Sequence, residues 1–292
     1  MTTSLVIDVE DLRVTYGDFT AVRDLSFQVH RGELYALLGT NGAGKTSTLE
    51  VVEGHRPPAS GSVRIFGSSP QDRNAVRPRM GIMLQESGFS PDLTVRESVG
   101  LVGALSGRRD DIGRVLAVAG LTQKASTRVA QLSGGEKRRL DFATAVYGGP
   151  DLVILDEPTT GLDIQSRDSL WAAVDRLRDT GTTVVLTTHY LEEAQQRADR
   201  IGLMHEGTLR QEGTVAELTR TLPAVITFSL PPGAPEPPII GALNGGFHVE
   251  TFSLQHDLHR LLGWAHDSGV PLLDLTAGPT RIDDVFRALD SN

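Results

Sequence analysis

The chain has 292 residues, 39% of them hydrophobic, with no cysteine and a formal net charge of −9. This composition suits one large domain, or a large and a small one, and excludes general disorder, a disulfide framework and a cysteine nucleophile. The acidic balance argues against broad contact with nucleic acid, and no apolar run reaches the length of a bilayer-spanning helix.

The first part of the chain is predicted to form strands. Its N-terminal segment MTTSLVIDVEDLRV lacks a basic region followed by a long apolar run, so we interpret it as a strand and not as a signal peptide. Alternating segments over 4–35 predict an antiparallel β layer. Residues 33–39 form an apolar run, which is typical of a buried strand that leads into a loop.

A glycine-rich loop follows this strand. Its sequence GTNGAGKT matches the phosphate-loop pattern G-x-x-x-x-G-K-[ST]. Small residues let backbone N–H groups turn inward around phosphate oxygens, and a helix predicted over 46–52 adds the positive end of its dipole. We expect Lys45 to neutralise the β- and γ-phosphates, Thr46 to bind Mg²⁺ and Ser47 to reach the α-phosphate. The expected nucleotide-binding residues of the loop are Gly39, Thr40, Asn41, Gly42, Ala43, Gly44, Lys45, Thr46 and Ser47.

The middle of the chain changes from strand to helix and back. A short strand is predicted over 61–66, and the pattern is helical from about 86 to 150. Strands return at 152–156 and 182–188, with a helix over 166–179 between them. This alternation predicts a parallel sheet with crossover helices, into which the helical block is inserted as a subdomain.

Two further motifs surround the end of the helical block. Ser133, in LSGGE, is a predicted N-cap of the helix GEKRRLDFATAV. Asp156 and Glu157 end the apolar run LVILDE, and two charges there are costly unless they serve a cation or a reaction. Two solvated carboxylates at a strand end are the alternative interpretation.

The last part of the chain differs in composition. The stretch LPAVITFSLPPGAPEPPII is rich in proline and predicts a linker or an irregular edge. Beyond it, DLHRLLGWAHDSG predicts a helix with Leu258, Leu261, Leu262 and Ala265 on one face. A strand (VPLLDL) and a final helix (IDDVFRALD) complete a small α/β appendix. We therefore expect two domains, 1–220 and 221–292.

The order of GTNGAGKT, LSGGE and LVILDE within residues 4–220 resembles the ATP-binding subunit of an ABC transporter. The sequences TTHYLEEAQQRADRIGLMHEGTLRQEGTVAEL and RIDDVFRALD further resemble the ATPases of ABC-2 type exporters, in particular the daunorubicin-resistance group. The resemblance implies an α/β P-loop NTPase fold with a RecA-like core. It also implies an N-terminal antiparallel β layer, an inserted helical subdomain at about 86–150 and a C-terminal accessory domain.

The resemblance implies roles for single residues. Asp156 would hold Mg²⁺, with Thr46 and Gln85 as further ligands, and Glu157 would polarise the attacking water. His189, at the end of TTVVLTTH, would contact the γ-phosphate and orient that water. Gln85 would also touch the water, at the point where the chain enters the helical block. Tyr16, in a turn before the glycine loop, would stack on adenine.

The LSGGE stretch implies a dimer, because in this family it binds the ATP that a second subunit holds. Ser133, the Gly135 N–H and the helix dipole would point at a γ-phosphate. Many family members have glutamine where this chain has Glu136, and we expect Glu136 to face the ribose or the region of Arg138 and Arg139. The residues predicted to contact the second subunit's ATP are Ser133, Gly134, Gly135 and Glu136.

The expected function is that of an ATP-hydrolysing motor of an ABC-2 type exporter, with ATP and Mg²⁺ as cofactors. A homodimer would couple its closure to a separate transmembrane permease that exports a drug, an antibiotic or a lipid-like compound. Residues 87–98 would help form the groove that receives the permease's coupling helix. No nucleic-acid partner is expected, and the chain would lie at the cytoplasmic face of a bacterial membrane. A soluble ABC ATPase of DNA repair or translation and a non-catalytic regulatory subunit are the alternatives.

Overall fold

The structure is a computed structural model that describes residues 4–85, 88–220, 223–238, 242–243 and 246–279, together with 282 and 285. Its contacts divide the chain into two compact units, Met1–Glu212 and Gly213–Asn292. The helix predicted over 282–290 lies outside the described residues except for 282 and 285. The domain boundary predicted after residue 220 also falls beside residues that are not described.

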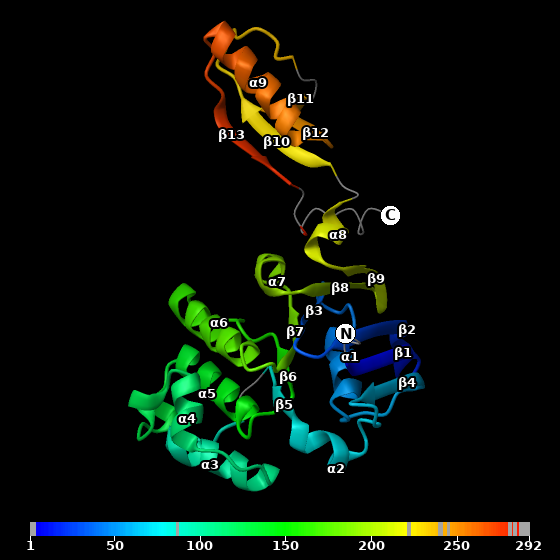
Figure 1. Ribbon diagram of the computed structural model, residues 1–292, viewed down its shortest axis with the longest axis vertical. Coiled ribbons are helices and arrows are strands. Elements are labelled where there is room, and N and C mark those ends of the chain that lie inside the picture. Colours follow the sequence, from blue (N-terminus) through cyan, green and yellow to red (C-terminus); the bar gives the residue numbers. More distant parts are fainter. Residues whose placement is uncertain are drawn as a thin grey trace. The chain divides into compact units, whose positions relative to one another are not determined.

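A six-stranded sheet forms the centre of the first unit (Figure 1). Its strand order is β5-β6-β7-β3-β8-β9, and the first five strands in this order pair in parallel. Three of its strands are the apolar runs predicted at 33–39, 152–156 and 182–188. The strands are β3 (Leu34–Gly39), β5 (Met80–Met83), β6 (Leu152–Asp156), β7 (Thr183–Thr188), β8 (Arg200–His205) and β9 (Thr208–Gly213).

The strand order decides which loops meet. Strand β3, which leads into the glycine loop, lies between β7 and β8, and β6 lies on the other side of β7. Parallel strands place their carboxyl ends at one edge of the sheet. The glycine loop, Glu157 after β6, His189 after β7 and Gln85 after β5 therefore gather at that edge.

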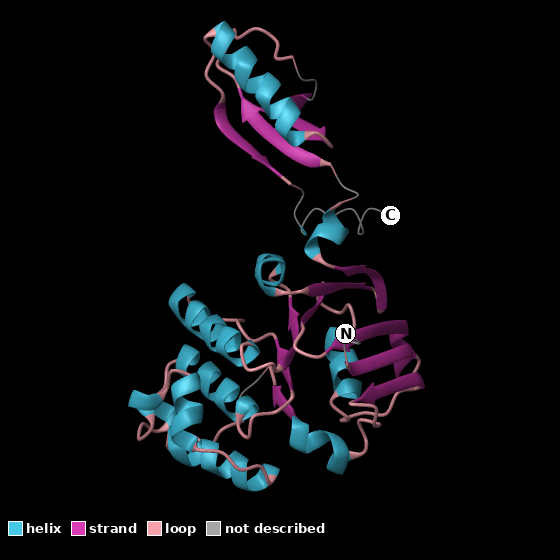
Figure 2. Ribbon diagram, in the orientation of Figure 1, coloured by secondary structure: helices cyan, strands magenta, loops and turns pink. Residues whose placement is uncertain are grey.

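An antiparallel layer covers one flank of this sheet, as the sequence predicts (Figure 2). Its strand order is β2-β1-β4, and β1 pairs with both neighbours. A buried core joins this layer to β3 and to the helix that follows the glycine loop. The elements are β1 (Leu5–Tyr16), β2 (Phe19–His30), β4 (Ser60–Ile65) and α1 (Lys45–Val52).

The helical block lies on the other side of the unit (Figure 2). Capping boxes fix the start of two of its helices, one built by Thr94 with Glu97 and one by Ser133 with Glu136. The crossover helix after β6 begins at the N-cap Asp163. The helices are α3 (Val95–Ser106), α4 (Ile112–Val118), α5 (Gly134–Val146), α6 (Ile164–Arg178) and, after β7, α7 (Leu191–Arg197).

The second unit is a small antiparallel sheet with one helix on it. The strand order is β11-β12-β10-β13, and a core of Ile226, Phe228, Val249 and Leu261 lies between sheet and helix. Its elements are β10 (Ala224–Ser229), β11 (Ala242–Leu243), β12 (Gly246–Thr251), α9 (Leu254–Ser268) and β13 (Leu273–Gly278), preceded by the short helix α8 (Val215–Thr219).

Two predictions for this unit are wrong. The stretch interpreted as a linker contains β10, because AVITFS alternates between the core and the other face and lies between Pro223 and the proline-rich run that begins at 231. Leu262 is 46% exposed and does not share the core face of α9. That face runs through Leu254, Leu258 and Leu261, and Trp264 occupies its edge.

Candidate functional site

The glycine loop links the end of β3 to the start of α1. Gly44 is the N-cap of α1 with φ 99°, and no side chain caps the helix there. A Cβ on Gly44 would lie 2.6 Å from the Ala21 carbonyl oxygen. Only glycine fits both constraints, and the first N–H groups of α1 stay free of a side-chain cap. This arrangement suits the binding of phosphate oxygens.

Lys45 occupies the inside of this loop. Its side chain is buried, and Nζ donates hydrogen bonds to the carbonyl oxygens of Gly39 (2.7 Å) and Thr40 (3.2 Å). Burial lowers the pKa of Lys45, and the charges of Glu157 and Asp156 act in the opposite direction. The ammonium is thus held against the loop, within the field of both acids, and a polyphosphate would supply a stronger acceptor than the two carbonyls.

The two acids at the end of β6 have different surroundings. Asp156 is buried and its Oδ1 accepts a hydrogen bond from the Thr187 hydroxyl. Burial raises the pKa of Asp156, which the bond from Thr187 partly offsets. The Asp156 carboxylate is a buried, hard oxygen donor beside the glycine loop, which also carries the Thr46 hydroxyl. Mg²⁺ uses donors of this kind together with water and phosphate oxygens.

Glu157 points at His189. Its Oε2 lies 2.9 Å from His189 Nδ1 and accepts a hydrogen bond of 3.0 Å from the Thr160 hydroxyl. The backbone of Glu157 has φ 45°, which is uncommon for a residue with a side chain, and its N–H donates to the Thr187 carbonyl (3.1 Å). The two predicted catalytic side chains are therefore in contact, in a backbone conformation that neighbouring strand β7 helps to hold.

Gln85 follows β5 at the same edge of the sheet. Its side chain is exposed, and its carbonyl oxygen accepts a hydrogen bond from Arg138. The next two residues, 86 and 87, lie outside the described residues, so the predicted groove segment 87–98 is described only from 88 onward.

Tyr16 lies against the first turns of α1. Its hydroxyl donates a hydrogen bond to Glu50 Oε2 (2.8 Å) and lies 3.2 Å from Ser47 Oγ. The Arg56 guanidinium stands over the ring, 4.0 Å from its centroid. The ring is 40% exposed, and stacking of adenine on it stays a prediction.

The LSGGE stretch forms the N-terminus of α5. Ser133 Oγ accepts a hydrogen bond from the Glu136 N–H (3.2 Å), and Glu136 Oε2 accepts one from the Ser133 N–H (2.9 Å). Lys124 Nζ lies 3.0 Å from Glu136 Oε1, and the bonds from Ser133 and Lys124 lower the pKa of Glu136. Glu136 therefore turns back over the helix start and not toward Arg138 or Arg139, because the capping box holds it there.

Sequence reasoning missed two residues that touch this site. Thr187, on β7, binds both Asp156 and the backbone of Glu157. Arg138, on α5, is buried and donates hydrogen bonds to the backbone carbonyl oxygens of both acids. A signal for Arg138 was present, because it shares the buried face of α5 with Phe142 and Ala145 at helical spacing.

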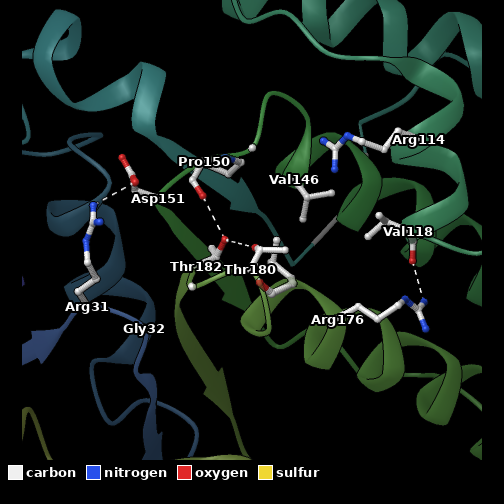
Figure 3. A pocket seen from close by; sticks show the side chains of 13 residues that line it. Arg31, Gly32, Arg114, Val118, Val146, Pro150, Asp151, Arg176, Thr180 and Thr182 are labelled. Carbon is white, nitrogen blue, oxygen red and sulfur yellow. Dashed lines mark hydrogen bonds and ion pairs between the residues drawn. The ribbon is translucent and has the colours of Figure 1, made fainter.

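A cavity of about 620 Å³ lies at the amino ends of the parallel strands and away from the glycine loop (Figure 3). Arg31, Asp151 and Thr182 line it, each just before or at the start of a strand. Arg31 pairs with Asp151 (3.2 Å), and Arg176 donates to the Val118 carbonyl (2.9 Å). Because Arg31 and Arg176 already have partners, this cavity offers no free arginine to a ligand from these two positions. The candidate active site therefore remains the sheet edge that carries the glycine loop.

Comparison with known proteins gives matches on both units. The ABC transporter family model matches residues 22–160, and a model of the C-terminal domain of ABC transporter domain-containing protein-like chains matches 224–280. The Nod factor export ATP-binding protein I of Paraburkholderia xenovorans is 40% identical over 218 residues, 73% of this chain and 72% of that protein. The linearmycin resistance ATP-binding protein LnrL of Bacillus subtilis is 34% identical over 257 residues, 86% of this chain and 80% of that protein.

Solved structures agree with the fold. The ATP-binding subunit of an ABC transporter superposes with a TM-score of 0.68 at 27% identity, covering 74% of this chain and 92% of that one. A bacterial ABC transporter cassette described as dimeric superposes with a TM-score of 0.65 at 25% identity, covering 71% and 98%.

Proposed function

The chain belongs to the ABC transporter ATP-binding family, and from this membership we propose that it is the motor subunit of an export system. As a member of this family it is an ATPase that binds ATP. The single observation that carries the catalytic proposal is the contact of Glu157 with His189 at the edge that also holds Lys45.

The catalytic step follows from the placement of these groups. The loop N–H groups and Lys45 bind the phosphates, which offsets their charge and orients the γ-phosphate. Glu157 accepts a proton from the attacking water. His189, which is hydrogen-bonded to the same carboxylate, orients that water toward the γ-phosphate. Thr46, Gln85 and Asp156 would hold Mg²⁺, which when bound polarises the phosphate oxygens and neutralises their charge.

We propose that two subunits complete each ATP site. Ser133 and Gly135 lie at the start of a 13-residue helix, where free N–H groups and the dipole favour an anion. In the dimer this helix would face the γ-phosphate held by the other copy, so that ATP closes the dimer and hydrolysis reopens it. A ligand that binds one of two states more tightly shifts the equilibrium toward that state.

We propose further that the partner is a separate ABC-2 type permease at the cytoplasmic face of the membrane. No helix among the described residues is long and apolar enough to cross a bilayer. Two relatives bear names that refer to Nod factor export and to linearmycin resistance, which supports an export role for a drug-like or lipid-like compound. The functional division into 1–220 as motor and 221–292 as accessory domain belongs to the same proposal.

The test is co-purification from membranes. The tagged chain, expressed in its own organism and extracted in mild detergent, is expected to bring with it a multi-helix membrane protein whose presence stimulates ATP turnover. A chain that stays in the aqueous fraction and binds ribosomes or DNA would favour the soluble alternatives and contradict the export proposal.

A further inference from the structure

Arg138 carries a buried positive charge in the interior of the first unit. It lies in the second turn of α5 and is 6% exposed. A guanidinium has five N–H donors, and here each one reaches a different backbone carbonyl. Nε donates to Pro158 (3.1 Å), Nη1 to Leu84 (2.6 Å) and Gln85 (3.0 Å), and Nη2 to Asp156 (2.8 Å) and Glu157 (2.7 Å).

This arrangement differs from an ordinary buried ion pair. The carboxylate paired with Arg138 is that of Asp141 on the same helix, whose Oδ2 lies 3.8 Å from Nη1, beyond hydrogen-bond distance. Hydrogen bonds to five carbonyl dipoles therefore compensate most of the cost of burying the cation. Burial lowers the pKa of Arg138, and Asp141, Asp156 and Glu157 oppose that change.

The five carbonyls belong to two separate backbone segments. Leu84 and Gln85 follow β5, whereas Asp156 ends β6 and Glu157 and Pro158 come directly after it. The segment after β6 contains the left-handed residue Glu157. Such a conformation is unfavourable for a residue with a side chain and persists only where the surroundings hold it.

We propose that Arg138 is a positioning residue that couples α5 to the two groups around the attacking water, Gln85 and Glu157. One planar fork fixes both backbone segments at once, so neither moves without the other or without α5. Ser133 begins the same helix and is the proposed contact to the second subunit's ATP. Binding of that ATP to α5 is thus transmitted to the catalytic groups of this subunit's own site, a coupling that rests on the proposed function.

The test replaces the planar guanidinium of Arg138 with an ammonium and so keeps the positive charge. Arg138→Lys leaves one nitrogen with three donors, which cannot reach five carbonyls in two segments. Because Gln85 and Glu157 are then misplaced, kcat for ATP hydrolysis is expected to fall about tenfold or more, while KM stays within about twofold. Turnover is counted per ATP-binding site, so that any unfolded fraction does not enter. Arg176→Lys, which changes an exposed arginine bonded to one carbonyl, is the matched control and keeps kcat within about twofold.

A double variant separates positioning from a purely structural role. In a Glu157→Gln background, measured with radiolabelled ATP, Arg138→Lys is expected to change the residual turnover less than about threefold, because its main target is already removed. Equal losses in both backgrounds, or a normal kcat in the Arg138→Lys single variant, would overturn the inference. If Glu157→Gln alone kept normal turnover, the proposed role of Glu157 would fail instead.

Discussion

At the scale of single residues, Glu157 shows how the backbone sets the chemistry. The left-handed conformation turns its side chain out of the strand direction and toward His189 and Thr160. The motif LVILDE predicts an acid at this strand end but says nothing of that conformation. Three groups that are distant in sequence determine it: Thr187, Arg138 and the strand pairing of β6 with β7.

Lys45 is predicted to be essential for nucleotide affinity. In Lys45→Ala the phosphates lose a charge-assisted donor worth about 1.5–3 kcal/mol, so the Kd for ATP rises about 10- to 100-fold. Isothermal titration with ATP checks the change, and the melting temperature without nucleotide shows whether the variant is folded. A folded variant whose Kd stays within about twofold of the original would contradict the assignment of the loop.

Glu53 makes the stability of the folded chain depend on pH. It lies at the C-terminal end of α1, where burial, with the nearby charge of Asp156, raises its pKa from 4.5 to about 8. Between these values the folded protein keeps the proton that the unfolded chain has released. The stability contributed by protonated Glu53 is therefore present at about pH 4.5 and is lost progressively as the pH rises to about 8.

Replacing Glu53 with glutamine tests this dependence. Glu53→Gln removes the titrating proton at nearly the same volume, so the fall in melting temperature between about pH 5 and pH 8 becomes smaller than in the original chain. Asp156, whose pKa burial also raises, keeps a slope of the same sign in both proteins. Thermal unfolding without nucleotide at several pH values provides the comparison, and two parallel curves would show that Glu53 does not hold its proton when folded.

At the scale of elements, α5 packs tightly against α6 at Gly135. A Cβ on Gly135 would meet the Ser166 hydroxyl and lie 2.8 Å from Ser166 Cβ, whereas a Cβ on Gly134 would meet nothing within 4 Å. The second glycine of LSGGE thus serves the packing of two helices in addition to its proposed contact with ATP.

Alanine at the two glycines is predicted to have opposite consequences. Gly135→Ala forces α5 away from α6 and costs about 1–3 kcal/mol in free energy of unfolding. Gly134→Ala, its neighbour, is neutral or slightly stabilising because alanine favours a helix. Denaturant unfolding without nucleotide measures both, and the same stability for the two variants would refute the close packing.

The elements differ in how far the sequence predicts them. Local patterns predict three buried strands (33–39, 152–156 and 182–188), the phosphate loop and the cap at Ser133 correctly in position, but β8 and β9 were not predicted. The strand over 224–229 was missed, because neighbouring prolines suggested an irregular segment although AVITFS alternates. The capping box of Glu136 with Ser133 is a local S-x-x-E pattern, whereas the contact of Glu136 with Lys124, twelve positions away, is not visible in a local pattern.

At the scale of the whole molecule, the topology of the first unit gathers the glycine loop, Gln85, Glu157 and His189 at one edge of the parallel sheet. Motif order alone predicts that they share a site, because the carboxyl ends of parallel strands share an edge. Contacts such as those of Arg138 with five carbonyls depend on how α5 packs against two strand ends and are not visible in a linear pattern.

The proposed working unit is a dimer with ATP between the glycine loop of one copy and the LSGGE helix of the other. The mass of Glu157→Gln in solution with Mg-ATP, measured by size-exclusion chromatography with light scattering, tests this most directly. Removing the catalytic carboxylate is expected to slow hydrolysis about 100-fold or more, so ATP persists and the variant elutes at twice the monomer mass, returning to the monomer with ADP. A variant that stays monomeric with bound ATP, or turns over ATP at the normal rate, would contradict the account.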